Sequence, residues 1–281
     1  MWLKRLSKLL RKPHLALHII TQNRAESLKW VLDQSSDFFD VVRVCDGGST
    51  DDTKQVIANC GAQYYYRKWD DQYHEQDNVL LRQCRPGDWV MIMDDDECPS
   101  WQLLNHLRPL VVTAQHLKFN MISLPALDEL DGVLSLPVEQ FISEVESGAR
   151  RPFRKLWLFQ YDWSVNSYGT PHRSVETVKR WWVYHQPYPY IHRKSSLSFL
   201  VNDCIHAWIN PSKQGYTEAE AKEMYAVLPK FQTSREILPW LEKEAGAAAA
   251  FIRFAEKYKD CSKPIRNWWA SYQELYGTHV C

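Results

Sequence analysis

Two kinds of hydrophobic segment alternate along the first part of the chain. Apolar runs typical of buried β-strands occupy residues 14–20, 41–46, 62–67 and 88–94. The segments between them carry apolar residues at helical spacing, over residues 25–36, 50–60 and 75–84. This alternation predicts an α/β fold, in which a mostly parallel central sheet has helices on both faces.

Polar clusters follow three of the predicted strands, at Thr21–Asn23, Asp46–Ser49 and Asp94–Glu97. Parallel strands bring their carboxyl ends to one edge of the sheet, and ligands of such sheets bind there. The third cluster ends a hydrophobic strand in four consecutive acids, within the sequence VMIMDDDECP. Because like charges repel, these acids need compensation. A divalent cation is the simplest candidate, and a solvated acidic turn is the alternative.

The charge balance and the cysteines limit the classes of function. Lys and Arg together number 34, as do Asp and Glu, so the chain lacks the basic excess that bulk nucleic-acid binding requires. Its seven cysteines include no C-x-x-C pair, which argues against a structural zinc site. Their odd number favours a reducing compartment. We therefore expect a cytoplasmic protein, and no segment is apolar enough to cross a bilayer.

The N-terminal segment is basic and amphipathic. Over residues 1–13, Trp2 and four leucines fall on one face of a helical pattern, and lysines and arginines fall on the other. This pattern predicts a helix that either lies peripherally on a membrane surface or docks on the protein's own core.

Two larger regions follow. Residues 14–210 form the main domain, with a first half at about 14–100 and a second half of short strands and Pro- and Trp-rich loops at about 101–210. Residues 211–281 carry helical patterns, opened by a capping box at Thr217 and Glu220, and predict a helical C-terminal extension.

Three motifs resemble those of the family 2 glycosyltransferases, in the order in which that family carries them. They are IITQNRAESL (19–28), VCDGGSTDDT (44–53) and GDWVMIMDDDECPS (87–100), the last resembling a branch with an Asp-x-Asp-Glu motif. A weaker likeness continues through RKLWLFQYDWSVNSYGTPHRSVE (154–176) and YIHRKSS (190–196). The resemblance implies a GT-A fold, which is Rossmann-like, and an inverting enzyme. Such an enzyme transfers a sugar from a nucleotide-diphosphate sugar, with a UDP-sugar favoured, to a hydroxyl of a glycan-type acceptor.

The resemblance also assigns a metal site. It implies that Asp94 and Asp96 hold Mn²⁺ or Mg²⁺ and that His192 completes the coordination shell. Oxygen ligands suit these cations, and the metal would stabilise the charge on the departing nucleotide.

The same resemblance assigns nucleotide contacts to the strand ends. It implies that Asp46 binds the base or the ribose, that Thr21 and Gln22 flank the base, and that Asp94 lies near the ribose and sugar. Asn23 and Asn78 complete the expected set.

The chain departs from the family pattern at two positions. Asp77 stands where many relatives carry an arginine before the asparagine, and Arg173 stands where relatives often carry a glutamate after the histidine. The second departure removes the simplest general base, which leaves four candidates open: Glu97, His172, Glu176 and Asp162.

Two alternatives to the leading hypothesis remain from the sequence. One is a non-catalytic nucleotide- or sugar-binding relative, and the other is a glycosyltransferase acting on a modified nucleic-acid base. The expected partners are a nucleotide-sugar donor and a glycan or lipid-linked glycan acceptor. The identity of both sugars and the linkage stay open.

Overall fold

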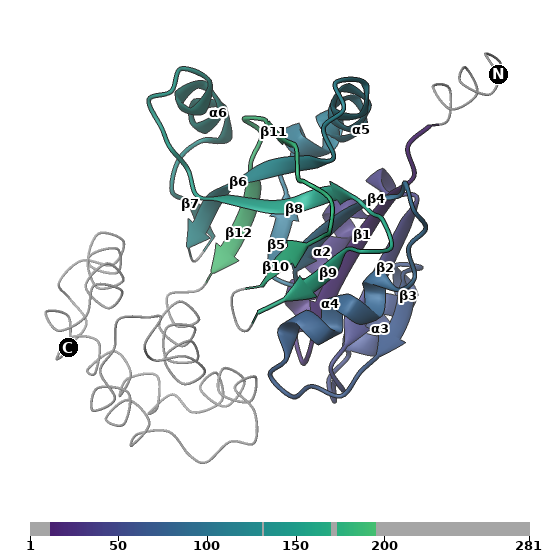
Figure 1. The fold of residues 1–281 in the computed structure, drawn as a ribbon. Helices are drawn as coiled ribbons and strands as arrows, with labels where there is room; N and C mark the ends of the chain where they lie inside the picture. Colours follow the sequence, from purple (N-terminus) through teal and green to yellow (C-terminus); the bar gives the residue numbers. More distant parts are fainter. Residues whose placement is uncertain (1–11, 131, 170–172, 195–281) are drawn as a thin grey trace, which may run out of the picture.

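The computed structural model describes residues 12–130, 132–169 and 173–194. The predicted N-terminal helix at 1–13, apart from its last two residues, and the predicted C-terminal extension at 211–281 lie outside the described residues. The centre of the structure is a mixed, mostly parallel sheet (Figure 1), in which neighbouring strands follow the order β3-β2-β1-β4-β8-β6-β12-β5, with β7 and β11 also paired to β6.

The first half of the sheet is parallel and alternates with helices, which confirms the predicted α/β class. Its strands are β1 (Leu15–Thr21), β2 (Val41–Asp46), β3 (Gln63–Tyr66) and β4 (Trp89–Asp94). The intervening helices are α2 (Ala25–Ser35), the short η1 (Ser36–Phe38), α3 (Thr53–Asn59) and α4 (Tyr73–Leu81).

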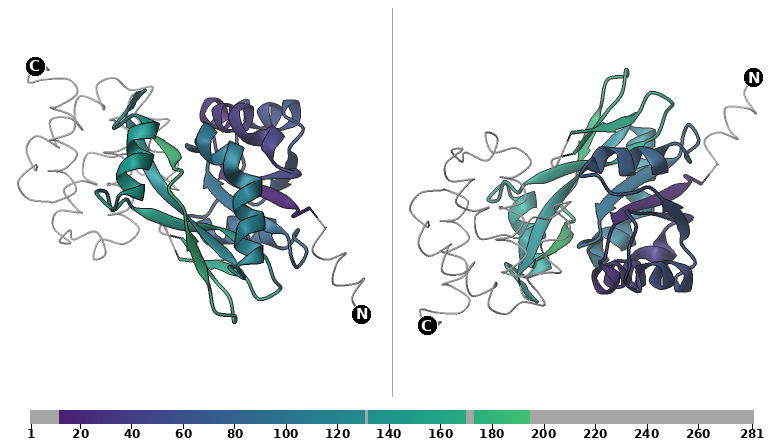
Figure 2. Two further views of the ribbon diagram at one scale, coloured as in Figure 1. Left: turned by 90° about the horizontal axis from the view of Figure 1, so that it is seen from above. Right: turned by 90° about the horizontal axis from the view of Figure 1, so that it is seen from below.

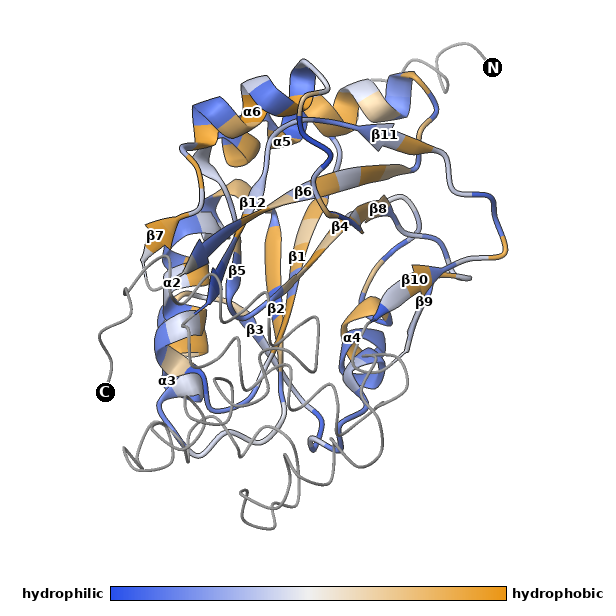
Figure 3. Ribbon diagram, turned by 90° about the vertical axis from the view of Figure 1, so that its left-hand side faces the viewer, coloured by the Kyte–Doolittle hydropathy of each residue, from blue (hydrophilic) through white to orange (hydrophobic). Residues whose placement is uncertain are grey.

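Successive residues of β1 point to opposite faces of the sheet. Leu17 and Ile19 are fully buried in a core shared with α2, whereas Ala16 packs in a second core with Leu81 from the end of α4. A strand that is buried on both faces has a continuous apolar sequence, because neither face meets water. The central strands are accordingly the most hydrophobic part of the ribbon (Figure 3).

The second half of the sheet is mixed. Its strands are β5 (Glu97–Pro99), β6 (Met121–Leu130), β7 (Val133–Leu134), β8 (Arg154–Gln160), β11 (Val183–His185) and β12 (Tyr190–Lys194). Two further strands, β9 (Asn166–Tyr168) and β10 (Ser174–Glu176), form a separate antiparallel ribbon beside α4.

Helices α5 (Trp101–His116) and α6 (Val138–Glu146) were not expected from the sequence. For α5 a signal is present, because the Ser100 side chain caps the helix by accepting a hydrogen bond from the Leu103 backbone N–H. The leucines that follow face the core. Pro109 lies inside this helix, although proline usually interrupts one.

The strand directions define two edges of the sheet. The parallel strands β1, β2 and β4 end at one edge, which we call the site edge. Strand β8 runs antiparallel to β4 and therefore begins at the site edge. Strand β12 pairs with β5, so that His192 lies opposite Glu97. Residues from both halves of the chain thus meet beyond Asp94. Among the described helices, none is long and apolar enough to span a bilayer.

The central strand provides a test of this packing. Leu17→Ala should lower the free energy of unfolding by about 2–5 kcal/mol, because it leaves a cavity between β1 and the helices. Val112→Ala, at an exposed position of α5, should change stability by about 0.5 kcal/mol or less. Urea unfolding of both variants measures the difference, and equal effects would contradict the assigned core.

Candidate functional site

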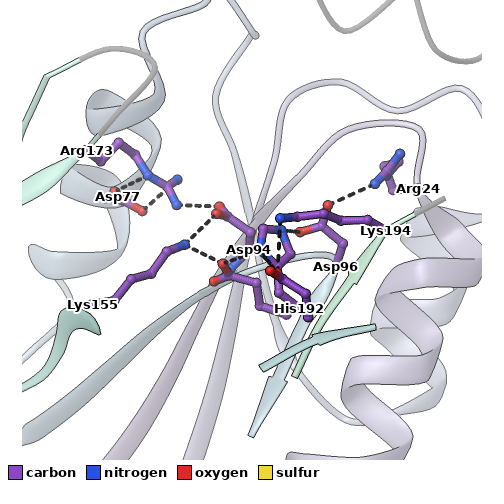
Figure 4. Close-up of polar contacts among 10 residues, drawn as sticks. Arg24, Asp77, Asp94, Asp96, Lys155, Arg173, His192 and Lys194 are labelled. Carbon is purple, nitrogen blue, oxygen red and sulfur yellow. Dashed lines mark hydrogen bonds and ion pairs between the residues drawn. The ribbon is translucent and has the colours of Figure 1, made fainter. Parts of the chain in front are cut away.

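A turn of consecutive acids forms the centre of the site. Strand β4 ends at Asp94, Asp95 and Asp96 make the turn, and Glu97 opens β5. The side chains of Asp95 and Glu97 are buried. Cationic side chains from distant parts of the sequence converge on this turn (Figure 4).

Two buried cations hold the first acid of the turn. The Lys155 ammonium lies 3.4 Å from Asp94 Oδ2, and the Arg173 guanidinium donates to Asp94 Oδ1. Lys155 also contacts the carboxylate of Glu97. The Arg173 side chain is only 2% exposed, so its charge depends on these acids for compensation.

The two departures from the family pattern pair with each other. Arg173 Nε lies 3.4 Å from Asp77 Oδ2, and the Ser167 hydroxyl donates to the same oxygen at 2.9 Å. The resemblance implies a positive charge at position 77 and a negative charge at position 173. This chain has the reverse, a negative charge at Asp77 and a positive charge at Arg173. This exchange brings a guanidinium, rather than a carboxylate, next to Asp94.

The indole ring of Trp157 contacts both Lys155 and Arg173. The Lys155 ammonium lies 4.6 Å and the Arg173 guanidinium 4.5 Å from the centre of the Trp157 ring, within the range of cation–π attraction. Burial disfavours the charged form of Lys155, but the carboxylates of Glu97 and Asp94 outweigh it and raise the lysine's pKa. Lys155 is thus a site residue that sequence reasoning missed.

The second and third acids of the turn are anchored by β1 and α2. The Thr21 hydroxyl donates to Asp95 Oδ2 at 2.8 Å, and Arg24 Nη2 donates to Asp96 Oδ2 at 3.3 Å. Thr21 is fully buried. Thr21 therefore helps to hold the acidic turn in place, and its contact with the nucleotide base, which the resemblance implies, stays a prediction.

His192 approaches the turn from β12. Its Nε2 lies 3.8 Å from Asp96 Oδ1, and its Nδ1 lies 3.7 Å from Asp128 Oδ1 and 3.9 Å from Glu97 Oε1. Asp96 and His192, two of the expected metal ligands, thus come together. Asp128 was not anticipated, because only the pairing of β6 with β12 places it opposite His192.

The charges around the turn fit a divalent cation. Six carboxylates and four cations meet around the turn, which leaves an excess of two negative charges. The carboxylates belong to Asp77, Asp94, Asp95, Asp96, Glu97 and Asp128, and the cations are Arg24, Lys155, Arg173 and Lys194. One divalent cation would balance this excess. Among the described residues no group of three or more His, Cys, Asp and Glu side chains is already arranged to hold a metal. Asp96 and His192 nevertheless offer the oxygen and nitrogen donors that Mn²⁺ accepts.

The predicted nucleotide side of the site is built from two loops. Asp46 Oδ1 accepts hydrogen bonds from the Gly48 and Ser49 backbones at 3.1 and 2.9 Å, and Tyr64 donates to Oδ2 at 3.1 Å. Gln22 Nε2 donates to the Gly47 carbonyl at 3.4 Å, and its Oε1 is buried without a described hydrogen-bond partner.

Two glycines and an asparagine fix these loops. Gly47 leaves room for Trp69, since an added Cβ would lie 3.0 Å from its ring, and Gly48 has a φ of +100°. Asn23 Oδ1 accepts from the Thr50 backbone at 2.7 Å and so joins the loops after β1 and β2.

Asn78, which is predicted to contact the nucleotide, bonds to the β9–β10 ribbon within the protein. Its Nδ2 donates to the Ser167 carbonyl at 3.1 Å, and its Oδ1 accepts from the Ser167 N–H at 2.8 Å. Both polar atoms of the amide thus fasten the β9–β10 ribbon to α4.

The general-base candidates are distributed over the molecule. Glu97 is buried against Lys155. Glu176 is exposed on β10, where it pairs with Asn166. Asp162 follows the end of β8, at the edge opposite the site, and bonds to Ser164. His172 lies outside the described residues.

Comparison with known proteins agrees with the motif analysis. Residues 17–114 match the model of the family described as glycosyl transferase family 2, which confirms the resemblance over this part of the chain. A TPR repeat-containing protein from Synechococcus elongatus is 27% identical over 107 residues, which are 38% of this chain and 26% of that protein.

Solved structures show weaker similarity. Glucosyl-3-phosphoglycerate synthase from Mycobacterium tuberculosis, in complex with Mn²⁺, UDP and glucosyl-3-phosphoglycerate, is 19% identical with a TM-score of 0.36, over 45% of this chain and 48% of that one. S. aureus TarS is 17% identical with a TM-score of 0.35, over 46% of this chain and 39% of that one. The chain therefore spans about half the length of these proteins or less.

The buried ion pair between α4 and the segment before β10 can be tested with a double-mutant cycle. Arg173→Gln should destabilise the protein by about 3–5 kcal/mol, because it leaves buried carboxylates without a cation. Adding Asp77→Asn should recover part of this loss, so the double variant should be more stable than the sum of the single effects predicts. Urea unfolding measures the cycle. Lys179→Gln, which breaks an exposed ion pair with Asp162, is the control, and strictly additive effects at 77 and 173 would contradict the pairing.

Asp77 also predicts a pH dependence. Burial raises the pKa of Asp77 to about 6, above its ordinary 3.8, although the Arg173 guanidinium acts in the opposite direction. The folded state therefore holds this proton more tightly than the unfolded state, and stability from Asp77 is present below about pH 4 and lost as pH rises through 6. Across this range wild type should lose stability relative to Asp77→Asn, which mimics the protonated acid. Unfolding curves from pH 4 to 7 measure the difference, and a constant difference would contradict the assignment.

Proposed function

We propose that the chain is a metal-dependent, inverting glycosyltransferase. It would transfer a sugar from a nucleotide-diphosphate sugar, with a UDP-sugar favoured, to a hydroxyl of a glycan-type acceptor. The observation that supports this most is the position of the family's motifs: the strand ends that carry them meet at the site edge, around the acidic turn. The match over residues 17–114 supports the same reaction class.

In this proposal Asp96 and His192 hold Mn²⁺ or Mg²⁺. The metal would supply positive charge to the diphosphate leaving group. Asp128 lies beside the other ring nitrogen of His192. It would fix the ring by accepting a hydrogen bond from the Nδ1–H, as carboxylates commonly do for metal-bound histidines. The Lys194 ammonium, 3.1 Å from Asp128, in turn holds that carboxylate.

Asp94, the third expected metal ligand, would also face the nucleotide-sugar donor. Its two oxygens already receive Lys155 and Arg173, so the carboxylate is held in one orientation. A fixed acceptor at this position suits the hydroxyls of a ribose or a sugar. Asp46, Gln22 and Asn23 would form the wall beside the base, because they line the adjoining loops.

The acceptor side uses the remaining candidates. Glu97 is fully buried and bonded to Lys155, which suits a role in holding the lysine better than proton transfer from a substrate. We propose His172 as the candidate for the general base, and Asn78 as the residue that fastens the β9–β10 ribbon to α4. Glu176 lies at the end of β10 that points away from the site, because the hydroxyl of the next residue, Thr177, donates to Asp162. Residues 1–12 would contact a membrane surface peripherally, next to a glycan or lipid-linked glycan acceptor.

A non-catalytic nucleotide- or sugar-binding protein is the second candidate function. The observation that favours it is Arg173, which occupies the position of a potential base and neutralises Asp94. This alternative predicts nucleotide binding without turnover, so binding and donor hydrolysis must be measured separately.

A thermal-shift panel of nucleoside diphosphates and their sugars, with and without Mn²⁺, tests the proposal. UDP should raise the melting temperature in a metal-dependent way, and UDP-sugar should be turned over slowly in the presence of metal. Asp96→Ala should abolish both effects without unfolding the protein, because it removes a metal ligand. The matched control is Glu129→Gln. Glu129 lies next to Asp128 on β6, and the change removes a carboxylate that pairs with Arg193.

The outcomes separate the two functions. Metal-dependent binding without turnover of any donor would favour the binding protein. Metal-dependent turnover that survives in Asp96→Ala would refute the metal assignment.

A further inference from the structure

Large apolar side chains are exposed at the edge of the sheet opposite the site. Strands β1, β4 and β6 begin at this edge, and β8 ends there. The first residue of β4, Trp89, pairs with the last residue of β8, Gln160. Two loops project from this edge, between β8 and β9 and between β10 and β11 (Figure 2). We call the surface formed by these loops the loop surface; its residues are Trp163, Val178, Lys179, Arg180 and Trp182.

The apolar residues of the loop surface are unusually open to water. Val178 is 90% exposed, Trp163 74% and Trp182 52%. A single exposed apolar residue needs no explanation, but three large ones gathered at one edge indicate a contact surface.

These side chains are held by specific contacts. Trp163 packs edge-on against Tyr161, with ring centres 6.1 Å apart. The two loops are joined where the Val178 N–H donates to the Ser164 hydroxyl at 3.3 Å. The Trp182 N–H donates to Asn120 Oδ1 at 2.7 Å, which fixes the second tryptophan beside the start of β6.

Basic side chains lie between the apolar ones. The Arg180 guanidinium is 4.5 Å from the centre of the Trp182 ring, and the Lys179 side chain is 64% exposed, although its ammonium also contacts Asp162. Tryptophan with lysine and arginine is the combination found where proteins meet the headgroup region of a bilayer.

The chain enters the described structure at this same edge. His14, just before β1, accepts a backbone hydrogen bond from Trp89 at 2.8 Å. The preceding residues 1–12 include five lysines and arginines and no acid, so a strong concentration of positive charge joins the fold at the same edge of the sheet as the loop surface.

We propose that the loop surface docks on an anionic phospholipid membrane. The exposed aromatic and apolar side chains would enter the headgroup region, and the basic residues would meet the lipid charges. The folded domain thereby contributes its own contact, which fixes its orientation as well as its attachment. This inference concerns the edge opposite the site and does not depend on the proposed reaction.

Vesicle binding of the full-length chain tests the proposal. Co-sedimentation with vesicles of phosphatidylcholine and phosphatidylglycerol should be about tenfold weaker for Trp163→Ser/Trp182→Ser than for wild type. The matched control is Tyr66→Ser/Phe153→Ser, which removes two exposed aromatic rings near the site edge and should bind as wild type does.

Two further variants separate the contributions. A chain lacking residues 1–12 should keep measurable binding, and adding the tryptophan changes to it should abolish that binding. Lys179→Glu/Arg180→Glu should weaken binding to the anionic vesicles and leave the weak binding to pure phosphatidylcholine unchanged, and circular dichroism should show native folding for each variant.

Two results would overturn the proposal. One is equal vesicle binding by wild type and the tryptophan variant, in both the full-length and the shortened chain. The other is a wild-type protein that ignores vesicles but self-associates in solution through the same two tryptophans, since that result would assign the loop surface to contacts between copies of the chain.

Discussion

The compensation of charge at the acidic turn governs the arrangement of the site. Several carboxylates so near one another cannot be buried unless cations contact them. The free-energy cost of burying an unpaired charge exceeds the stability that a packed core supplies. The cations come from distant elements: Arg24 precedes α2, Lys155 is the second residue of β8 and Arg173 precedes β10. The antiparallel direction of β8 is what brings Lys155 to the end of β4. The mixed second half of the sheet is therefore a requirement of the acidic turn as well as an extension of the core.

The parallel half of the fold could be predicted from the sequence, and the mixed half could be predicted only in part. Strands such as β1 are buried on both faces, so their apolar runs are continuous and easy to recognise. The pairing of β12 with β5 leaves no local pattern, because it joins residues nearly a hundred positions apart. For the same reason the sequence could nominate His192 but could not find Asp128 or Lys155, whose roles depend on which strand lies next to which.

Polar residues in the motif segments have structural partners that the motifs themselves do not reveal. Thr21 and Asn78 belong to segments that resemble ligand-binding motifs, yet their hydrogen bonds go to Asp95 and to the Ser167 backbone. Buried polar groups must be satisfied in the folded protein before any ligand arrives, so a site of this kind contains many polar residues that hold other residues in place. A motif therefore identifies a segment of the chain, while the hydrogen-bond partners of each residue show what that residue holds in place within the fold.

The two edges of the sheet have a joint consequence for the acceptor. Strand β1 has seven residues, which at ~3.3 Å each separates the edges by roughly 20 Å. If the loop surface rests on a membrane, the acidic turn faces away from the lipid and lies at about that height above it. A sugar attached directly to a lipid headgroup would not reach the turn in this orientation, whereas the outer residues of a longer glycan chain would. For the proposed glycosyltransferase, membrane docking by the opposite edge would therefore favour late additions to a growing lipid-linked glycan over the first addition to the lipid itself.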